Sequence, residues 1–325
     1  MTHTIRDIAR LSGFSTATVS RAFSAPQRVS ETTRKRVQEV AETLDYQPNA
    51  IARSMALQRT EKIAFLICKK RSSILDEFYA GVCEGIMQET NLSDYQLLVS
   101  TAEDWAVAKR KQVDGVILGG NASLDLISEF RSQNVKIVLA NHEVPGLELP
   151  CVVSDEEGGV RSALEYLIAK GHYKIGMLAG RFSPYISERR YAAFRSVMEE
   201  HGLSLDPSFI RMVEPDIESA TRAAMALLSP QERPTAVFGA NDVIAAGVIK
   251  AAHHLHLRIP QDVAVIGCDD SRLCRVVEPE LASIHISCVR MGSLAARQLL
   301  SLLAGEPVLP QRTVVPTDLC IRSSV

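Results

Sequence analysis

The sequence predicts a small all-helical region at the N-terminus, followed by a much larger α/β region built on parallel sheets. Two observations support this division. Within about the first sixty residues apolar positions recur at helical spacing, whereas from about residue 61 short apolar runs alternate with amphipathic stretches. A chain of 325 residues exceeds one typical domain, so two or three structural units are expected.

The composition is that of a globular protein with one basic end. Hydrophobic residues make up 46% of the chain and charged residues 23%, and the net charge is −2. Residues 1–62 carry ten Lys and Arg against six Asp and Glu, a net +4, so the rest of the chain carries −6. The N-terminus is polar, and no run approaches ~18 consecutive apolar residues, so we expect a cytoplasmic protein with no membrane partner.

Seven cysteines are scattered along the chain without a CxxC pair. Most of them lie in apolar runs, which predicts reduced core thiols and makes a metal site improbable. They are Cys68, Cys83, Cys151, Cys268, Cys274, Cys288 and Cys320.

The first sixty residues predict three short helices. Apolar residues share one face of the first helix at Ile5, Ile8, Ala9 and Leu11. Gly13 ends this helix in a turn, Ser15 caps a second helix to about Phe23, and Ser30 caps a third to about Leu44. Two short helices joined by a tight turn are typical of proteins that read the DNA major groove. Residues 14–21, FSTATVSR, taken alone are equally consistent with a surface helix of poor propensity.

The segment TIRDIARLSGFSTATVSRAFSAPQRVSETTRKRVQEVAETLDYQPNAIARSM resembles the DNA-binding headpiece and hinge of the LacI/GalR bacterial transcription regulators. The resemblance implies a helix-turn-helix headpiece at 1–47 and a hinge helix with linker at 48–60. It places Thr16 and Ala17 at the two main base-reading positions. Further positions at bases or phosphates are Thr4, Ser15, Thr18, Ser20, Arg21, Ser24, Arg28, Ser30, Thr33 and Tyr46.

YQPNAIARSM is similar to the hinge helix of the family, which in such proteins folds only when two subunits meet on DNA. The resemblance implies DNA contacts by Asn49, Ala52 and Met55, the last two in the minor groove. Where the family usually has a leucine wedge, this chain has Met55. An unbranched thioether still fits between base steps, so we expect bending of the DNA to be retained.

Apolar runs in the larger region predict buried parallel strands covered by helices on both faces. The runs lie at 62–68, 95–100, 113–120, 135–141, 151–155, 174–180, 235–242 and 263–270. Ligands of such folds bind beyond the carboxyl ends of the strands, where this chain has polar residues. These residues are Lys69, Lys70, Asn121, Asn141, Arg181, Asn241, Asp242, Asp269 and Asp270.

Residues 61–325 resemble the effector-binding and dimerisation domain of the same family, which is akin to periplasmic sugar-binding proteins. Matching motifs include LIAKGHYKIGMLAG, ERRYAAFRSVMEEHGL, FGANDVIAAGVIKAA and RIPQDVAVIGCDDS. The resemblance implies two doubly wound parallel-sheet subdomains joined by three crossovers. Subdomain one is expected at about 61–155 and 287–313, and subdomain two at about 156–286 and 314–325, with TDLCIRSS as its closing strand.

Effector contacts are implied residue by residue. Tyr79, with Phe78 as its neighbour, offers an aromatic face, and Arg190 holds ligand oxygens, with Arg189 less favoured. The acceptors suited to vicinal hydroxyls are Asn241 and Asp269. Structural alternatives remain open, because Arg190 is equally able to cap a helix and Asp269 to close its own turn.

Several features depart from the family pattern. Only TAEDWAVAKRKQ separates two predicted strands, so a helix that normally helps to form the dimer interface is shortened. Ser154 and Asp155 stand where aspartate and asparagine are frequent, which removes one usual ligand contact. Lys69, with Lys70 and Arg71, is either part of a solvated basic turn or a phosphate or carboxylate site. HHLH at 253–256 lies at an exposed helix end, where a metal is improbable.

The resemblance implies a repressor that binds a palindromic operator on double-stranded DNA as a homodimer, controlled by a small-molecule effector. The effector is expected to be a sugar or an acidic or phosphorylated sugar derivative. The alternative is an activator or co-repressor-type regulator with a nucleoside or purine ligand. No nucleophile–base pair or GxxxxGK[ST] loop is found, so we expect neither an enzyme nor a cofactor. A solute-binding protein is disfavoured by residues 1–58.

Overall fold

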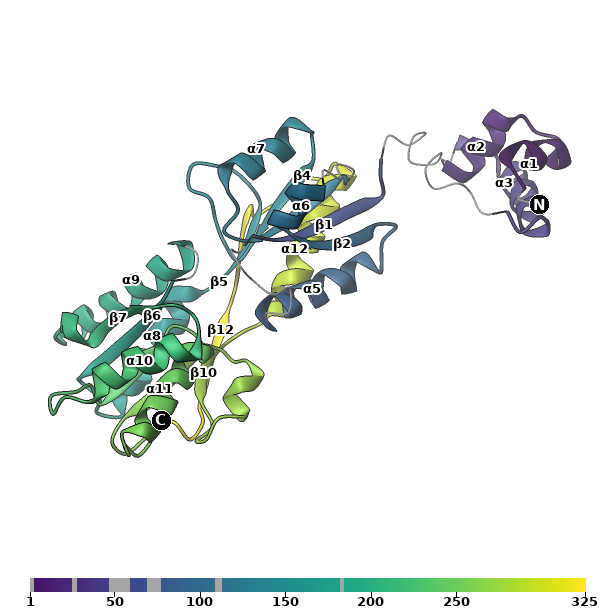
Figure 1. The fold of residues 1–325 in the computed structure, drawn as a ribbon. Helices are drawn as coiled ribbons and strands as arrows, with labels where there is room; N and C mark the ends of the chain where they lie inside the picture. The colour runs from purple at the N-terminus through teal and green to yellow at the C-terminus, as the bar shows by residue number, and fades with distance from the viewer. Residues whose placement is uncertain (1–2, 25–27, 47–58, 69–76, 109–112, 182–183) are drawn as a thin grey trace. The chain divides into compact units, whose positions relative to one another are not determined.

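The computed structural model describes residues 3–24, 28–46, 59–68, 77–108, 113–181 and 184–325 (Figure 1). The chain forms two compact units. The smaller unit contains residues 1–62 with 111–114, and the larger unit contains residues 63–110 with 115–325.

The smaller unit contains the three predicted helices, α1 (Ile5–Ser12), α2 (Thr16–Ser24) and α3 (Glu31–Thr43). Gly13 ends α1 with φ +79°, a value that glycine adopts without strain. The helices enclose a small core formed by Ile8, Ala9, Val19, Ala22, Val37, Val40 and Ala41. Leu11 lies at the edge of the apolar face and is 49% exposed.

The larger unit contains two sheets, as predicted, and each of them has six strands. The first has the order β11-β5-β4-β3-β1-β2. Its strands are β1 (Lys62–Cys68), β2 (Gln96–Thr101), β3 (Gly115–Gly120), β4 (Lys136–Ala140), β5 (Cys151–Ser154) and β11 (Arg312–Val315). The pairs from β1 through β3, β4 and β5 to β11 are parallel.

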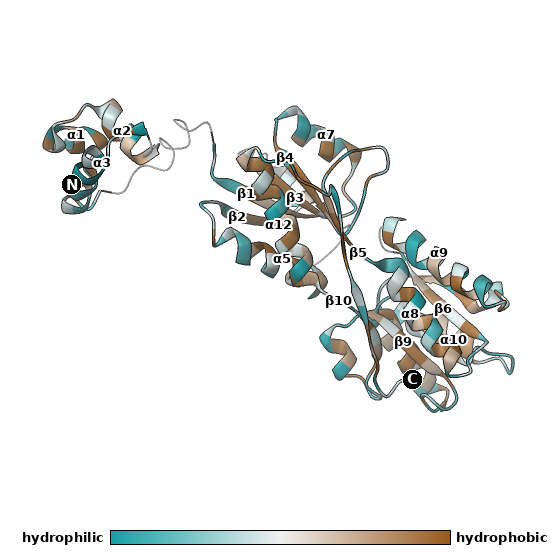
Figure 2. Cartoon of the chain, turned by 180° about the vertical axis from the view of Figure 1, so that it is seen from behind, coloured by the Kyte–Doolittle hydropathy of each residue, from teal (hydrophilic) through white to brown (hydrophobic). Residues whose placement is uncertain are grey.

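The second sheet has the order β12-β10-β9-β8-β6-β7. Its strands are β6 (Ile175–Gly180), β7 (Ile210–Val213), β8 (Ala236–Gly239), β9 (Ala264–Asp269), β10 (Ala282–Ile286) and β12 (Thr317–Cys320). All pairs are parallel except β10 with β12. In Figure 2 the central strands of both sheets are hydrophobic, which is typical of strands covered on both faces.

Helices cover both sheets. Those of the first are α5 (Glu77–Thr90), α6 (Ala102–Ala108), α7 (Leu124–Ser132) and α12 (Cys288–Ala304). Those of the second are α8 (Glu156–Ala169), α9 (Pro184–Glu200), α10 (Ile217–Leu228) and α11 (Asp242–His254), with 3-10 turns η2 (Pro207–Phe209) and η3 (Arg272–Arg275). In the second sheet the connections reverse direction at β7, so right-handed crossovers place α9 on one face and α10 and α11 on the other.

α5 and α12 lie side by side and pack so closely that backbone atoms of one helix approach those of the other (Figure 1). A Cβ atom on Gly85 would lie 1.9 Å from the carbonyl oxygen of Val289, and a Cβ on Gly292 would lie 1.9 Å from that of Val82. Only glycine fits at these two positions. The close packing fixes α5, whose N-terminal residues reach the candidate site.

The chain passes between the two sheets three times, at Asp155, at Ser287 and at Pro316. We expected the last passage at 313/314, but β11 stays in the first sheet through Val315, because it pairs with β5 along its whole length. Three strands, β7, β10 and β11, are absent from the predicted set. They are short and contain polar residues, so they lack the continuous apolar run of the other strands.

Candidate functional site

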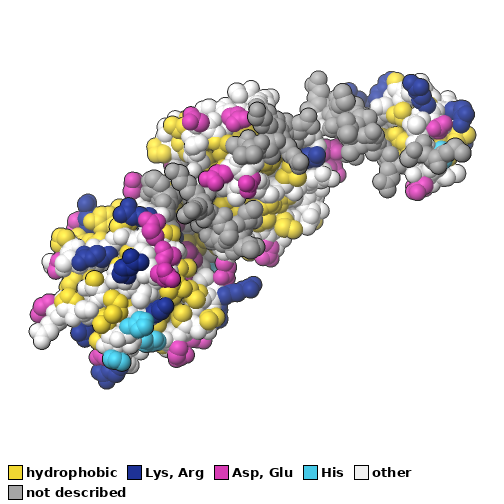
Figure 3. Space-filling model, in the orientation of Figure 1, with side chains coloured by type: hydrophobic (Ala, Val, Ile, Leu, Met, Phe, Trp, Pro, Cys, Tyr) yellow, Lys and Arg dark blue, Asp and Glu magenta, His cyan; other side chains and the backbone are white. Residues whose placement is uncertain are grey.

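The predicted DNA-reading helix, α2, presents small polar side chains on its exposed side. Ser15, Thr16, Ala17 and Arg21 are exposed, whereas Val19 is buried in the core of the unit. Figure 3 shows several Lys and Arg side chains on the visible face of the same unit. Such a surface offers short hydroxyl and methyl groups for base edges and positive charge for phosphates.

Some of the predicted DNA contacts also stabilise the helices on which they lie. Ser15 Oγ accepts from the N–H of Thr18 at 3.1 Å, and Ser30 Oγ accepts from the N–H of Thr33 at 3.3 Å. Both Thr4 N–H and Thr4 Oγ1 donate to the Asp7 carboxylate at 2.9 Å. The remaining predicted positions with described side chains are Ser20 and Tyr46, which are half-buried, and Arg28, which is exposed.

Other predicted DNA contacts lie outside the described side chains. They are Ser24, Asn49, Ala52 and Met55. The hinge helix expected within 48–60 lies outside the described residues up to position 58.

The second candidate site is a cleft of about 1310 Å³ in the larger unit. It lies beyond the carboxyl ends of the strands, where both doubly wound sheets place ligands. Polar residues at or just after the ends of six different strands line it: Asn121, Asn141, Arg181, Glu214, Asn241 and Asp269. All six strands thus end in the wall of one cleft, and five of these six residues are among the polar residues predicted from the sequence.

Arg190 of α9 occupies the centre of a buried polar cluster at this cleft. It is 4% exposed, and its Nε donates to Glu156 at 2.5 Å. Its other nitrogens donate to the carbonyl oxygen of Ala240 and lie 3.5 Å from the Asp269 carboxylate. Burial opposes the charge, yet the acidic groups around it raise the pKa of Arg190 well above its ordinary value. The guanidinium group is therefore charged and held in place.

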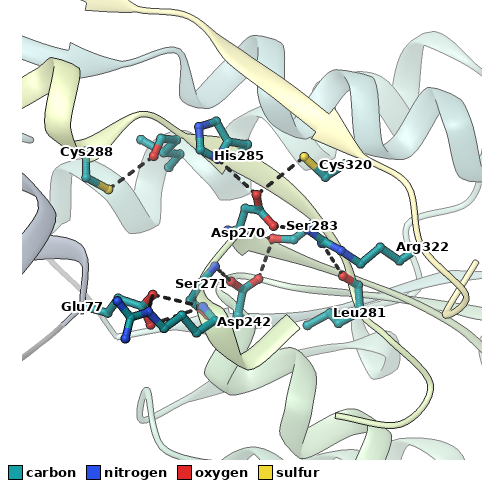
Figure 4. Close-up of polar contacts among 12 residues, drawn as sticks. Glu77, Asp242, Asp270, Ser271, Leu281, Ser283, His285, Cys288, Cys320 and Arg322 are labelled. Carbon is teal, nitrogen blue, oxygen red and sulfur yellow. Dashed lines mark hydrogen bonds and ion pairs between the residues drawn. The ribbon is translucent and has the colours of Figure 1, made fainter. Parts of the chain in front are cut away.

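Asn241 and Asp242 begin α11 at the floor of the cleft. Asn241 Oδ1 accepts from the N–H of Ile244 at 2.9 Å, so its carbonyl caps the helix. Asp242 is buried, and burial raises the pKa of its carboxyl group. It accepts from the Ser283 hydroxyl at 2.5 Å and from the N–H of Ser271 at 2.7 Å (Figure 4).

Comparison with known proteins identifies both parts of the chain. Residues 4–49 match the model described as bacterial regulatory proteins, lacI family, and residues 164–325 match a periplasmic binding protein-like domain. The probable HTH-type transcriptional repressor ExuR of Bacillus subtilis (strain 168) is 30% identical over 99% of this chain and 98% of its own length. The chain belongs to the LacI family.

A second relative and two solved structures are also similar to this chain. Catabolite control protein A of Priestia megaterium is 31% identical over 100% of this chain and 99% of its own. The solved transcriptional regulator CelR–cellobiose complex has a TM-score of 0.76 at 27% identity and covers 99% of this chain and 100% of its own. A lac repressor dimer bound to operator and the anti-inducer ONPF has a TM-score of 0.81 at 24% identity and covers 100% of this chain and 99% of its own.

This LacI-family chain is therefore a DNA-binding transcriptional repressor and not an enzyme. Among the residues described, no group of His, Cys, Asp or Glu is arranged to hold a metal ion. Within the same residues, no helix combines the length and apolar character needed to span a membrane.

The two aromatic residues predicted at the LacI-family effector site differ in exposure. The Tyr79 side chain is 2% exposed, and its ring lies 6.4 Å from that of Phe65 in the core. Tyr79 nevertheless lines the cleft, as does Phe78, which is half-buried. Both residues therefore remain predicted ligand contacts.

The departures from the LacI-family pattern have structural counterparts. α6 has only seven residues, in agreement with the shortened segment. Ser154 is buried, and its hydroxyl donates to Glu156 at 2.5 Å, so it supports the Arg190 cluster. Lys69, Lys70 and Arg71 lie outside the described residues.

Asn141 at the cleft and its buried neighbour His142 were not among the predicted site residues. Asn141 follows β4 with φ +60°, and its side-chain oxygen is buried with no hydrogen-bond partner among the described residues. His142 is 1% exposed and joins two cleft loops, because its ring nitrogens lie 3.3 Å from Ala140 O and 3.4 Å from the N–H of Ala122. Asn141 was visible as a polar residue after a strand, whereas nothing in the sequence indicates the burial of His142.

Proposed function

We propose that this repressor binds a palindromic operator as a homodimer and that a small polyhydroxylated, sugar-like effector in the cleft controls its DNA affinity. The observation that carries the proposal is the buried Arg190–Glu156–Asp269 cluster. It presents a fixed donor and a fixed acceptor beside Asn241 in a cleft large enough for such a ligand. Vicinal hydroxyl groups both donate and accept, so they match this arrangement.

The charge of the described walls bears on the choice between neutral and acidic sugars. Each described arginine lining the cleft has a carboxylate oxygen within 4 Å. The pairs are Arg181 with Glu214 (3.4 Å), Arg190 with Glu156 (2.5 Å) and Arg272 with Glu77 (3.8 Å). These walls favour a neutral sugar, whereas an acidic or phosphorylated sugar relies on Lys69, Lys70 and Arg71 for its charge partner.

Exposed apolar side chains support dimerisation through the first subdomain. They lie on α5, on the edge strand β2 and between the two, at Met87 (49% exposed), Leu92 (86%) and Val99 (39%), and Met87 and Val99 line one pocket. Contiguous exposed apolar residues mark interaction surfaces. A Val99→Lys variant should therefore sediment as a monomer, while Leu309→Lys, a change at an exposed apolar residue away from this face, should remain dimeric.

DNA binding is tested by selecting duplexes from a random pool with the full-length protein and sequencing them. We expect a palindrome, since two symmetric headpieces contact two half-sites. Thr16 and Ala17 are proposed to read base edges, and Met55 to wedge at a central pyrimidine–purine step. Enrichment of one asymmetric half-site would contradict the homodimer.

Calorimetry tests the effector with matched neutral and acidic pairs. D-glucose and D-galactose are compared with D-glucuronate, D-galacturonate and glucose 6-phosphate, and adenosine and hypoxanthine represent the purine alternative. Binding of a neutral sugar that is lost in Asp269→Asn supports the proposal. Binding of the purines alone would replace the sugar with that alternative.

A further inference from the structure

The turn that follows β9 is held by side chains from three different elements. Three consecutive backbone N–H groups of this turn each donate to one side chain (Figure 4). The pairs are Asp270 N–H with Ser283 Oγ (3.1 Å), Ser271 N–H with Asp242 Oδ2 (2.7 Å) and Arg272 N–H with Glu77 Oε1 (3.0 Å). The first two acceptors belong to the second subdomain. Glu77, however, is the first residue of α5 in the first subdomain, so one of the three hydrogen bonds crosses the cleft.

The turn needs such support because its backbone is unfavourable. Asp269 has φ +111° and Asp270 has φ +51°, in a region that residues other than glycine rarely adopt. Conformations of this kind persist only where surrounding contacts hold them. The same turn carries the Asp269 carboxylate, 3.5 Å from Arg190 in the cleft. The position of this acceptor therefore depends on the bonds that hold the turn.

The bond from Arg272 has no local substitute. Ser271 is the N-cap residue of η3, yet its side chain makes no capping hydrogen bond. The first N–H of this short helix is instead satisfied by a carboxylate 195 residues away in the sequence. The guanidinium group of Arg272 lies 3.8 Å from the same carboxylate, but its side chain is 92% exposed, so that ion pair adds little. The backbone hydrogen bond is the contact that matters.

We propose that Glu77 is a positioning residue. It belongs to the first subdomain and supplies the third of the three acceptors that fix the turn carrying Asp269. When the walls of the cleft separate, the N–H of Arg272 loses its acceptor and the turn is held by two bonds instead of three. Asp269 then loses part of its support. The consequence for ligand affinity rests on the proposed effector function, whereas the contact itself does not.

This coupling gives the effector leverage on the subdomains. A ligand that binds Asp269 in its supported position binds the closed arrangement more tightly than the open one. By linkage it shifts the population toward closure in proportion to that difference in affinity. Through Glu77, the position of the first subdomain thus affects the Asp269 turn of the second subdomain.

Residue-resolved amide hydrogen exchange on the ligand-free, full-length protein tests the proposal. In Glu77→Ala the amide of Arg272 should exchange about tenfold faster or more, the factor expected for one hydrogen bond to a charged acceptor. The amides of Asp270 and Ser271 are internal controls and should change much less. Glu77→Gln should largely restore protection, because its side-chain oxygen still accepts.

Glu84→Ala is the matched control. Glu84 lies on the exposed side of the same helix, and its described hydrogen bond goes to Gln88, one turn further along. This variant should exchange like the wild type. Unchanged exchange at Arg272 in Glu77→Ala would overturn the proposal. Equal acceleration throughout α5 and η3 would also overturn it, since it would indicate general loosening.

A second readout separates this proposal from the effector function. If a sugar binds, Glu77→Ala should weaken its Kd about tenfold and Glu77→Gln should restore it. Gln88→Ala changes a residue of α5 that is not in the lining of the cleft, and it should not change the Kd. A Kd unaffected by Glu77→Ala would overturn the positioning role. If no sugar binds, the proposed effector class fails, while the exchange result decides the role of Glu77 independently.

Discussion

His142 should make the first subdomain lose stability as the pH falls below about 6.5. The side chain is 1% exposed and lies between the loops that follow β3 and β4. Its contacts fit a neutral ring, with Nδ1–H donating to Ala140 O and Nε2 accepting from the N–H of Ala122. Burial lowers the pKa of His142 from 6.5 to about 4, and the hydrogen bond to Ala140 O opposes this shift only in part.

The sign and size of the effect follow from this shift. Above pH 6.5 the ring is neutral in both the folded and the unfolded chain, so the stability is complete. Below 6.5 the unfolded chain takes up a proton and the folded chain does not, so the free energy of unfolding decreases until the pH reaches about 4. At about 1.4 kcal/mol per pH unit, the full interval corresponds to roughly 3 kcal/mol.

Urea unfolding at pH 7, 6 and 5 measures this effect. Trp105, the single tryptophan, reports on the first subdomain, because its ring lies 6.3 Å from that of Phe130. Between pH 7 and 5 the wild type should lose about 2 kcal/mol more than His142→Asn, which has no titrating ring. His253→Asn changes an exposed histidine of α11 and should follow the wild type.

Parallel loss of stability in the wild type and in His142→Asn would refute the reasoning. It would mean that the folded protein takes up the proton as readily as the unfolded chain. A difference of the opposite sign would mean that the imidazolium is stabilised in the folded state.

Three further predictions concern packing, the buried cluster and DNA. Gly85→Ala should destabilise the protein by about 3 kcal/mol in thermal or urea unfolding, because its Cβ meets backbone, whereas Gly81→Ala meets only the Cys288 side chain at 2.9 Å and should cost less. Arg190→Met should lower the free energy of unfolding by about 3–5 kcal/mol, since Glu156 is left buried and unpaired; urea unfolding followed by circular dichroism measures it. The double variant Arg190→Met with Glu156→Met should recover much of that loss. Arg21→Ala should weaken operator and unrelated duplex alike, and should reduce the slope of log affinity against log salt by about one.

The elements predicted from sequence are those whose signal is local. The headpiece helices have caps and apolar spacing within a few residues, and the central strands form continuous apolar runs because both faces of each sheet are covered. β7 and β11 are edge strands of four residues, IRMV and RTVV, which are defined by pairing with a distant neighbour. No local pattern separates such segments from a loop.

In the candidate site, too, the features with a local sequence signal were predicted and those that depend on distant residues were not. Polar residues after strands were placed at the cleft, because parallel strands end at one edge of their sheet. Their partners were not predictable: Arg190 bonds Glu156, 34 residues away, and Arg272 bonds Glu77 across the cleft. How deeply each of the adjacent aromatic residues Phe78 and Tyr79 is buried depends on the rotation of α5, which is set by packing in the core.

The two C-terminal strands, β11 and β12, constrain how the protein can be made. They are separated only by Pro316, yet each is the edge strand of a different sheet. A ribosome-bound chain that lacks the residues after 311 has neither sheet complete, although more than nine-tenths of the sequence has been synthesised. Both subdomains should therefore reach their final form together and late, and a premature stop near position 311 should leave two exposed sheet edges, a substrate for proteases and for aggregation.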